Sequence, residues 1–169
     1  PALAPRRLDA TPYLVQVRPG PTGLEVVAEA YGDLFTVPLD DGVPRNLTNS
    51  SHAAERSGAW SPNGAWIAHA SDQSGEYELE LIRPDGSESR RLSQGSFGWW
   101  TGIWWHPDST HLAAANHVGE LILFDIEDGT STLLATDAQA NTPEVAFSPN
   151  GQHLAWSCFQ PDRLRRAIA

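Results

Sequence analysis

Short apolar runs alternate with turn residues along the whole chain. Between Ser57 and Ser93 the order is "SGAW", "SPNG", "AWIAHAS", "DQSG", "EYELELI", "RPDG" and "SESRRLS". Proline presets the second position of a turn, and glycine supplies the positive φ that a chain reversal requires. The pattern therefore predicts four short strands in this stretch and an all-β fold.

The same pattern recurs with a nearly constant period. A four-residue turn with proline in second place occurs as "GPTG", "SPNG", "HPDS" and "SPNG". Its prolines are 41, 45 and 42 residues apart, at Pro21, Pro62, Pro107 and Pro149. Helical repeats of similar length would need apolar residues at i, i+3, i+4 and i+7, and that spacing is missing. We therefore predict a β-propeller with four-stranded blades and a period of roughly 43 residues.

The repeat also predicts how the chain is divided. The expected units are residues 13–56, 57–100, 101–143 and an incomplete unit at 144–169. About three and a half blades cannot close a ring, and the last blade would present an unpaired strand edge. We therefore expect a partial β-propeller that is a fragment of a larger, closed one.

Composition narrows the class of protein. The formal net charge of −10 disfavours nucleic-acid binding, which needs a basic surface. One cysteine, Cys158, excludes an internal disulfide, and no apolar run has membrane-spanning length. Most of the tryptophans should pack between blades. In "FGWWTGIWW", Phe97 to Trp105, neighbours on a strand face opposite sides, so one or two tryptophans should be exposed.

Motifs for chemistry are few. Ser51 and His52 are adjacent, but neighbours on a strand point apart, and the sequence places no orienting carboxylate beside them. We expect an inter-blade loop there. The six histidines show no HExxH or H-x-H grouping, so we predict no metal site. No GxSxG, GxGxxG or phosphate-binding loop occurs. Taken alone, the residues predict a scaffold without catalytic residues or cofactor.

Two levels of resemblance follow from these strings. The proline turn followed by an apolar strand resembles the WD40-like, TolB-type propeller repeat. The stretch Tyr31 to Leu79, with "RNLT", "WSPNGAWIA" and "SDQSGEYEL", resembles more specifically the opening blades of the second, larger propeller in the tricorn protease family. The similarity continues more loosely through Ser157. This chain departs from the usual repeat at Asn63, Asn150 and Ser109, all of them compatible with a turn.

The tricorn resemblance implies a function. Members of that family are large cytoplasmic serine proteases that assemble as hexamers, with two propellers, a PDZ-like domain and a catalytic core behind them. By this resemblance the chain is a cytoplasmic, non-catalytic propeller segment that helps to admit or filter peptide substrates. Its partners would be peptides and the remaining domains of a larger polypeptide, which would itself be a homo-oligomeric serine peptidase. No position here corresponds to the catalytic residues.

In this architecture the inner strand of each blade lines the central channel. The repeat places those strands near residues 13–17, 57–60, 101–105 and 144–147. The candidates for channel-lining or peptide-contacting positions are Glu55, Arg56, Trp104 and Glu144.

Two alternatives remain open. The chain is also similar to a TolB-type protein-binding propeller of the bacterial envelope, which would be periplasmic and preceded by a signal peptide and an α/β domain. A further interpretation places the propeller before an α/β-hydrolase peptidase of the prolyl oligopeptidase class, which would require a GxSxG motif downstream.

Overall fold

The chain folds into a row of four antiparallel β-sheets. The structure, a computed structural model, describes residues 11–95, 97–137, 143–160 and 163–168. After a 3₁₀ turn, η1 (Thr11–Tyr13), the first sheet contains β1 (Leu14–Pro19), β2 (Glu25–Ala30), β3 (Asp33–Pro38) and β4 (Arg45–Asn46). The second sheet contains β5 (Glu55–Trp60), β6 (Ile67–Ser71), β7 (Glu78–Ile82) and β8 (Ser89–Arg91). The third contains β9 (Trp100–Trp105), β10 (His111–Asn116), β11 (Glu120–Asp125) and β12 (Ser131–Thr136). The fourth contains β13 (Val145–Phe147), β14 (Leu154–Gln160) and β15 (Arg163–Ile168).

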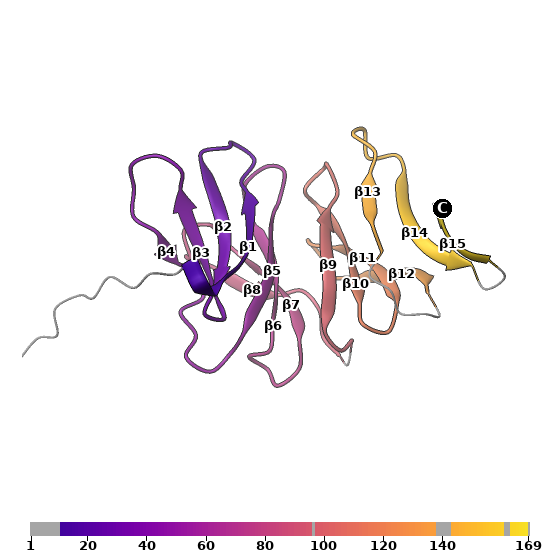
Figure 1. The fold of residues 1–169 in the computed structure, drawn as a ribbon, viewed down its shortest axis with the longest axis horizontal. Helices are drawn as coiled ribbons and strands as arrows, with labels where there is room; N and C mark the ends of the chain where they lie inside the picture. The colour runs from indigo at the N-terminus through magenta and orange to yellow at the C-terminus, as the bar shows by residue number, and fades with distance from the viewer. Residues whose placement is uncertain (1–10, 96, 138–142, 161–162, 169) are drawn as a thin grey trace, which may run out of the picture.

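Each sheet is one blade of a β-propeller, as the repeat predicts. Strands pair in chain order within every sheet, so the described residues form three four-stranded blades and a three-stranded one. The blades follow one another along the long axis (Figure 1). No described helix is long and apolar enough to cross a membrane. The division at 13–56, 57–100, 101–143 and 144–169 stays a prediction.

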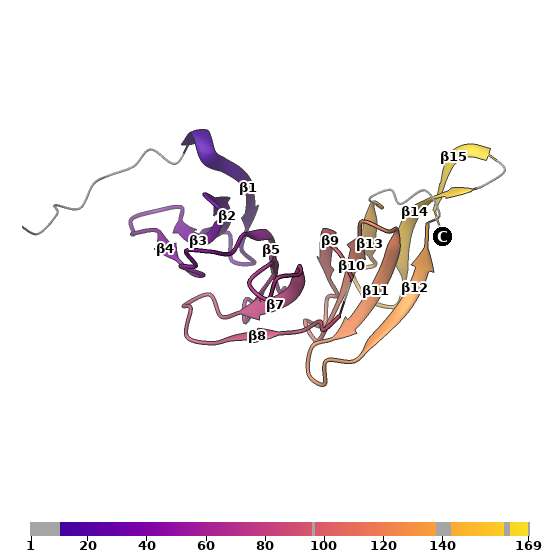
Figure 2. The same cartoon turned by 90° about the horizontal axis from the view of Figure 1, so that it is seen from below.

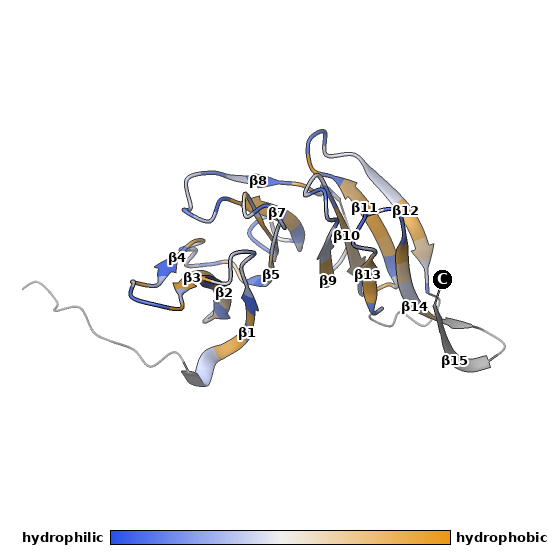
Figure 3. Ribbon diagram, turned by 90° about the horizontal axis from the view of Figure 1, so that it is seen from above, coloured by the Kyte–Doolittle hydropathy of each residue, from blue (hydrophilic) through white to orange (hydrophobic). Residues whose placement is uncertain are grey.

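The first strand of each blade lies on the same side of the array. Strands β1, β5, β9 and β13 are each at one edge of their sheet, and Figure 3 shows them along one side. β5 contacts both β1 and β9, and β9 contacts β13. These four strands form the inner row. The view in Figure 2 shows β8 and β12 on the opposite side of the array.

The repeated proline turns have one geometry. In each, the fourth residue donates its backbone N–H to the carbonyl of the first, with N···O distances of 2.8 to 3.1 Å. That fourth residue has φ between 64° and 72°, at Gly23, Gly64, Ser109 and Gly151. Glycine adopts this conformation without steric cost. At Ser109 the side chain has a separate use, because its hydroxyl accepts a hydrogen bond from the backbone N–H of Asn63 at 3.1 Å. The serine therefore links the turns of the second and third blades.

Apolar layers hold the blades together. The layer between the first two blades contains Val27, Leu34, Leu47, Ile67 and Ile82. The layer between the second and third is larger and includes Leu79, Leu81, Trp100, Ile103, Leu112 and Phe124. Alternate residues of β10 and β11 face the third layer, beside Val145 of the fourth blade. A central strand of a propeller blade is buried on both faces, which explains the hydrophobic middle strands and hydrophilic β4 and β8 in Figure 3.

The tryptophan cluster divides as predicted. Trp99 is 58% exposed, whereas its neighbour Trp100 is 5% exposed and packs in the layer between the second and third blades. Trp105 reaches back to the second blade and donates its Nε1–H to the carbonyl of Ala59 at 2.9 Å. Trp99, directly before β9, and Trp100, the first residue of β9, therefore face opposite sides, as alternation predicts.

Candidate functional site

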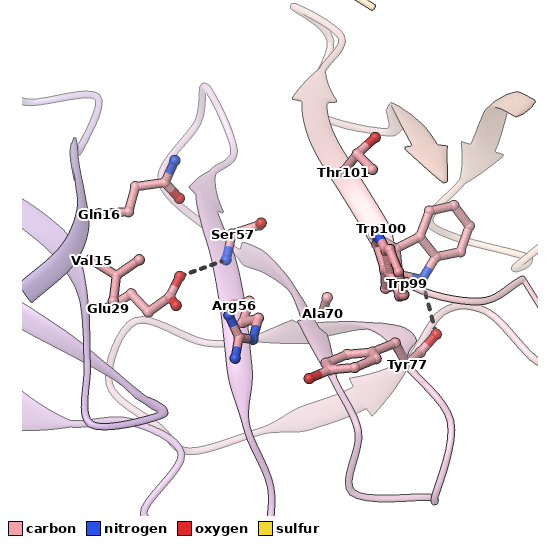
Figure 4. A pocket seen from close by; sticks show the side chains of 10 residues that line it. All are labelled: Val15, Gln16, Glu29, Arg56, Ser57, Ala70, Tyr77, Trp99, Trp100 and Thr101. Atoms are coloured by element: carbon pink, nitrogen blue, oxygen red, sulfur yellow. Dashed lines mark hydrogen bonds between the residues drawn. The ribbon is translucent and has the colours of Figure 1, made fainter. Parts of the chain in front are cut away.

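A groove crosses the inner row where three blades meet. Its volume is about 610 Å³, within the usual range for ligand sites. Figure 4 shows side chains from three blades converging on it. We call this the inner groove, lined by Val15, Gln16, Glu29, Arg56, Ser57, Ala70, Tyr77, Trp99, Trp100 and Thr101.

Three β-bulges build the inner groove. The pairing of β1 with β2 skips Val15, the pairing of β5 with β6 gains one residue between Arg56 and Ala59, and the pairing of β9 with β10 skips Thr101. Each bulge lies on the first strand of its blade and lines the inner groove. A bulge leaves one residue outside the ladder and redirects its side chain. Three blades therefore present irregular backbone at one place.

The central bulge is held by the neighbouring blade. Ser57 has φ of 61°, a left-handed conformation that is costly for serine. Its backbone N–H donates to the Glu29 carboxylate in β2 at 3.1 Å, as drawn in Figure 4. The next residue, Gly58, has little space for a side chain, since a Cβ atom there would lie 3.0 Å from Val27 and 3.2 Å from Leu34. Packing and one charge-assisted hydrogen bond therefore fix the bulge.

The groove combines one cation with aromatic surface. Arg56 is exposed beside Ser57, and on the far wall Trp100 donates its Nε1–H to the carbonyl of Tyr77 at 3.1 Å (Figure 4). Trp99 stands on the same wall with its ring 4.5 Å from that of His117. The arrangement offers a positive charge, flat apolar faces and bulged backbone, which are contacts suited to an extended polypeptide.

The four predicted site residues have different surroundings. Arg56 lines the inner groove. Glu55 precedes it but is 2% exposed, and both its carboxylate oxygens accept from the Ser50 hydroxyl at 2.9 Å. Burial raises the pKa of Glu55, while the Ser50 hydroxyl opposes the shift. In this structure Glu55 holds the loop before β5, so the charged side chains that line the groove are Arg56 and Glu29, whose carboxylate is bonded to the Ser57 N–H.

Trp104 and Glu144 lie away from the inner groove. Trp104 is half-buried and packs on the apolar layer between the third and fourth blades. It also lines a second hollow, about 560 Å³ in volume, at the opposite end of the inner strands. Glu144 is exposed, directly precedes β13, and its backbone N–H donates to the Ser157 hydroxyl at 2.9 Å. The peptide-contacting role of all four residues stays a prediction.

The inner strands expected at residues 13–17 and 57–60 contain Gln16 and Ser57, but nothing in the sequence indicated Glu29 or Tyr77 as contributors to the groove. Adjacent tryptophans in "FGWW" signalled an exposed aromatic but not what it would face. Strand alternation assigns Ser57 to a regular strand, and the bulge depends on Glu29 from another blade. No local signal in the sequence indicates that contact.

Ser51 and His52 lie in the loop before β5. Both are exposed, and the Ser51 hydroxyl is 3.4 Å from Nδ1 of His52. Among the described residues, no carboxylate is hydrogen-bonded to His52. A nucleophile-base pair needs such an orienting group, so this loop does not have the geometry of a serine hydrolase site.

Comparisons with known proteins agree on the propeller. No family model matches the chain. The tricorn protease homolog 1 of Streptomyces coelicolor is 29% identical over 105 residues, which cover 60% of this chain and 10% of that protein. Among solved structures, the tricorn protease superposes with a TM-score of 0.78 at 13% identity, covering 92% of this chain and 15% of its own. The putative TolB from Agrobacterium tumefaciens superposes with a TM-score of 0.73 at 20% identity, covering 92% and 56%.

These identities and coverages show how far the similarity extends. The chain spans a tenth of the length of the Streptomyces relative, and the structural likeness is one of fold. The turns, the order of strands in the sheets and both structural comparisons indicate a β-propeller. The chain has the β-propeller fold that the tricorn protease and TolB structures share.

Proposed function

We propose that the chain is a non-catalytic peptide-binding propeller module, and that its inner groove contacts extended peptide segments. The observation that carries this proposal is the convergence of three bulges on one groove. The three bulged strands are edge strands of their sheets, and an edge strand offers backbone groups to a second chain. The bulges redirect side chains towards the same place. Strain held by surrounding structure, as at Ser57, is common at functional sites.

The lining suggests which peptides bind. Arg56 favours a carboxylate, either an acidic side chain or a C-terminus, because guanidinium and carboxylate form paired hydrogen bonds. Trp99 and Tyr77 favour an apolar or aromatic side chain a few residues away. The proposed ligand is therefore an extended peptide with an apolar residue close to a carboxylate.

Likeness to tricorn proteins supports a specific setting. In a tricorn-like peptidase, such a groove would admit or filter peptide substrates on their way to a catalytic core in another part of the polypeptide. In a TolB-like setting, the same groove would bind a protein segment in the bacterial envelope. Coding sequence on either side of the chain separates the settings, since a following PDZ-like domain and protease core favours the first and a preceding α/β domain favours the second.

Peptide binding itself can be measured on this chain. A panel of dye-labelled peptides, with and without a carboxylate near an apolar residue, is titrated with the chain and followed by fluorescence anisotropy. Arg56→Ala should weaken binding of carboxylate-bearing peptides about 10-fold, the usual effect of losing one charged hydrogen bond. The matched control is Arg91→Ala, an exposed arginine on β8 of the same blade. Equal affinity for all peptides, or equal loss in both variants, contradicts the proposal.

A further inference from the structure

A second cluster lies outside the inner groove, in the turn between β9 and β10. The sequence "HPDSTH" reverses there and brings its two histidines together. Nδ1 of His106 is 2.8 Å from Oδ2 of Asp108, and Nδ1 of His111 is 2.9 Å from the same oxygen. The three atoms lie within 4.8 Å of one another. Two imidazoles and a carboxylate thus meet at one point.

The outer ring nitrogens of both histidines face oxygen atoms. Nε2 of His106 is 2.9 Å from the carbonyl oxygen of Gly151 in the fourth blade. Nε2 of His111 is 3.5 Å from Oδ2 of Asp125. The carbonyl acceptor assigns the ring proton of His106 to Nε2, which leaves a lone pair on its Nδ1. The backbone N–H of Asp108 supports this for His106, because it donates to Nδ1 at 3.2 Å. Nδ1 of His111 lies at hydrogen-bond distance from the Asp108 carboxylate, at 2.9 Å, and from the Thr110 hydroxyl, at 3.0 Å.

The inner ring nitrogens meet at one carboxylate oxygen. Nδ1 of both histidines lies within 3 Å of Oδ2 of Asp108, so a bound ion would replace the hydrogen bonds that now join these groups to one another, to the Asp108 N–H and to the Thr110 hydroxyl. Metal-binding histidines show the same outer arrangement, with the second ring nitrogen donating to a carboxylate or a backbone carbonyl. The shared point therefore has the donors of a metal site and the partners that orient them.

We propose that Nδ1 of His106, Oδ2 of Asp108 and Nδ1 of His111 bind one divalent transition-metal ion of the zinc class. Two imidazoles and a carboxylate suit zinc, with water in the fourth position. Donors about 2.0–2.2 Å from the ion are separated by about 3.3 Å in a tetrahedron. The Asp108 oxygen therefore needs to recede by about half an ångström from each ring, a movement open to an exposed side chain.

The backbone of the turn bonds to one carboxylate oxygen of Asp108. This oxygen, Oδ1, accepts from the backbone N–H of Thr110 at 2.7 Å and of His111 at 3.2 Å. Oδ1 therefore serves the turn while Oδ2 faces the two rings, so one carboxylate can hold the turn and bind an ion at the same time. Because His106 is bonded to Gly151, the ion would connect the third and fourth blades. Bound metal should therefore stabilise the packing of these blades.

The test is a titration of the metal-free chain with zinc chloride, followed by calorimetry. One equivalent should bind, and the midpoint of thermal unfolding should rise. His106→Gln and His111→Gln should each weaken binding at least about 10-fold, while His52→Gln, a substitution in the exposed loop, should leave it unchanged. Asp108→Asn keeps an oxygen for the turn and should also bind more weakly. Near-ultraviolet circular dichroism confirms that each variant is folded.

A measurement on the unaltered chain keeps the proposal testable if a variant does not fold. Nitrogen-detected NMR reports the tautomer and metal contact of all six histidines. Addition of one equivalent of zinc should change the Nδ1 signals of two histidines and saturate. Absence of saturable binding, undiminished binding in a double His106→Gln, His111→Gln variant, or unchanged histidine signals overturns the proposal.

Discussion

Acidification should weaken the fold through one buried histidine. His69 lies in β6 and is 1% exposed, and its Nε2 is 3.9 Å from the carboxylate of Glu80. Burial lowers the pKa of His69 from 6.5 to about 4. A group whose pKa is depressed on folding binds more protons when unfolded, so its penalty is absent above pH 6.5 and grows as the pH falls towards 4.

The size of the effect follows from the two pKa values. Integration of the proton uptake gives a loss of about 2 kcal/mol at pH 5 and about 3 kcal/mol at pH 4. For a domain of this length, 2 kcal/mol corresponds to a fall of about 4–8 °C in the unfolding midpoint. Burial raises the pKa of Glu80, and protonation of that group favours folding at low pH. The histidine term must therefore be isolated by difference.

The substitution His69→Leu isolates the contribution of His69 to the pH dependence of the unfolding free energy. Urea unfolding of the wild type and of this variant, followed by tryptophan fluorescence between pH 7 and pH 4, gives two curves whose separation changes with pH. We expect that change to reach about 2 kcal/mol at pH 5. His52→Leu, the same substitution at an exposed histidine, should run parallel to the wild type. Parallel curves for His69→Leu as well would refute the reasoning, because they would mean that solvent reaches His69 between the first two blades.

Two further substitutions probe the packing of the blades. Gly58→Ala places a Cβ atom 3.0 Å from Val27 and 3.2 Å from Leu34, and overpacking of this kind should lower the unfolding free energy by about 1–3 kcal/mol; an unchanged urea midpoint would contradict the described contact between blades. Trp105→Phe removes the hydrogen bond to the carbonyl of Ala59 at 2.9 Å and should cost about 1 kcal/mol in the same assay, whereas no loss would place the indole elsewhere.

The sequence predicts the repeated parts of this fold well. Each proline turn is determined by its own residues, because proline and a residue with positive φ fix the chain reversal locally. Strands β6, β7 and β8 of the second blade lie within the runs expected of them, and β5 begins two residues before its run, at Glu55. Alternation of adjacent side chains likewise predicts that Trp99, directly before β9, and Trp100, its first residue, differ in exposure, since that rule needs only the local chain.

The candidate site is harder to predict because it depends on contacts between blades. Arg56 was expected near the channel and lines the inner groove. Its neighbour Glu55 is buried and accepts a hydrogen bond from the Ser50 hydroxyl. Strand alternation does not describe this contact across a loop. The bulge at Ser57 requires Glu29 from the first blade. Neither interaction has a local signature.

The turn between β9 and β10 brings two histidines together at Asp108. The expectation that histidines are scattered is wrong for His106 and His111. Once the turn is recognised, these residues are its two ends, and the backbone N–H of His106 bonds to the carbonyl of His111 at 3.0 Å. Spacing of five residues is inconspicuous along the chain, yet across a hairpin it places two side chains together.

The most direct test of the central claim is to map peptide contacts on the chain by amide NMR. An unlabelled peptide with an apolar residue next to its C-terminal carboxylate is titrated into the isotope-labelled chain. If peptides bind in the inner groove, the amide signals of the three bulge residues, Val15, Ser57 and Thr101, and the indole signal of Trp99 should shift and saturate. Shifts confined to other surfaces, or no shifts at millimolar peptide, would contradict a peptide-binding inner groove.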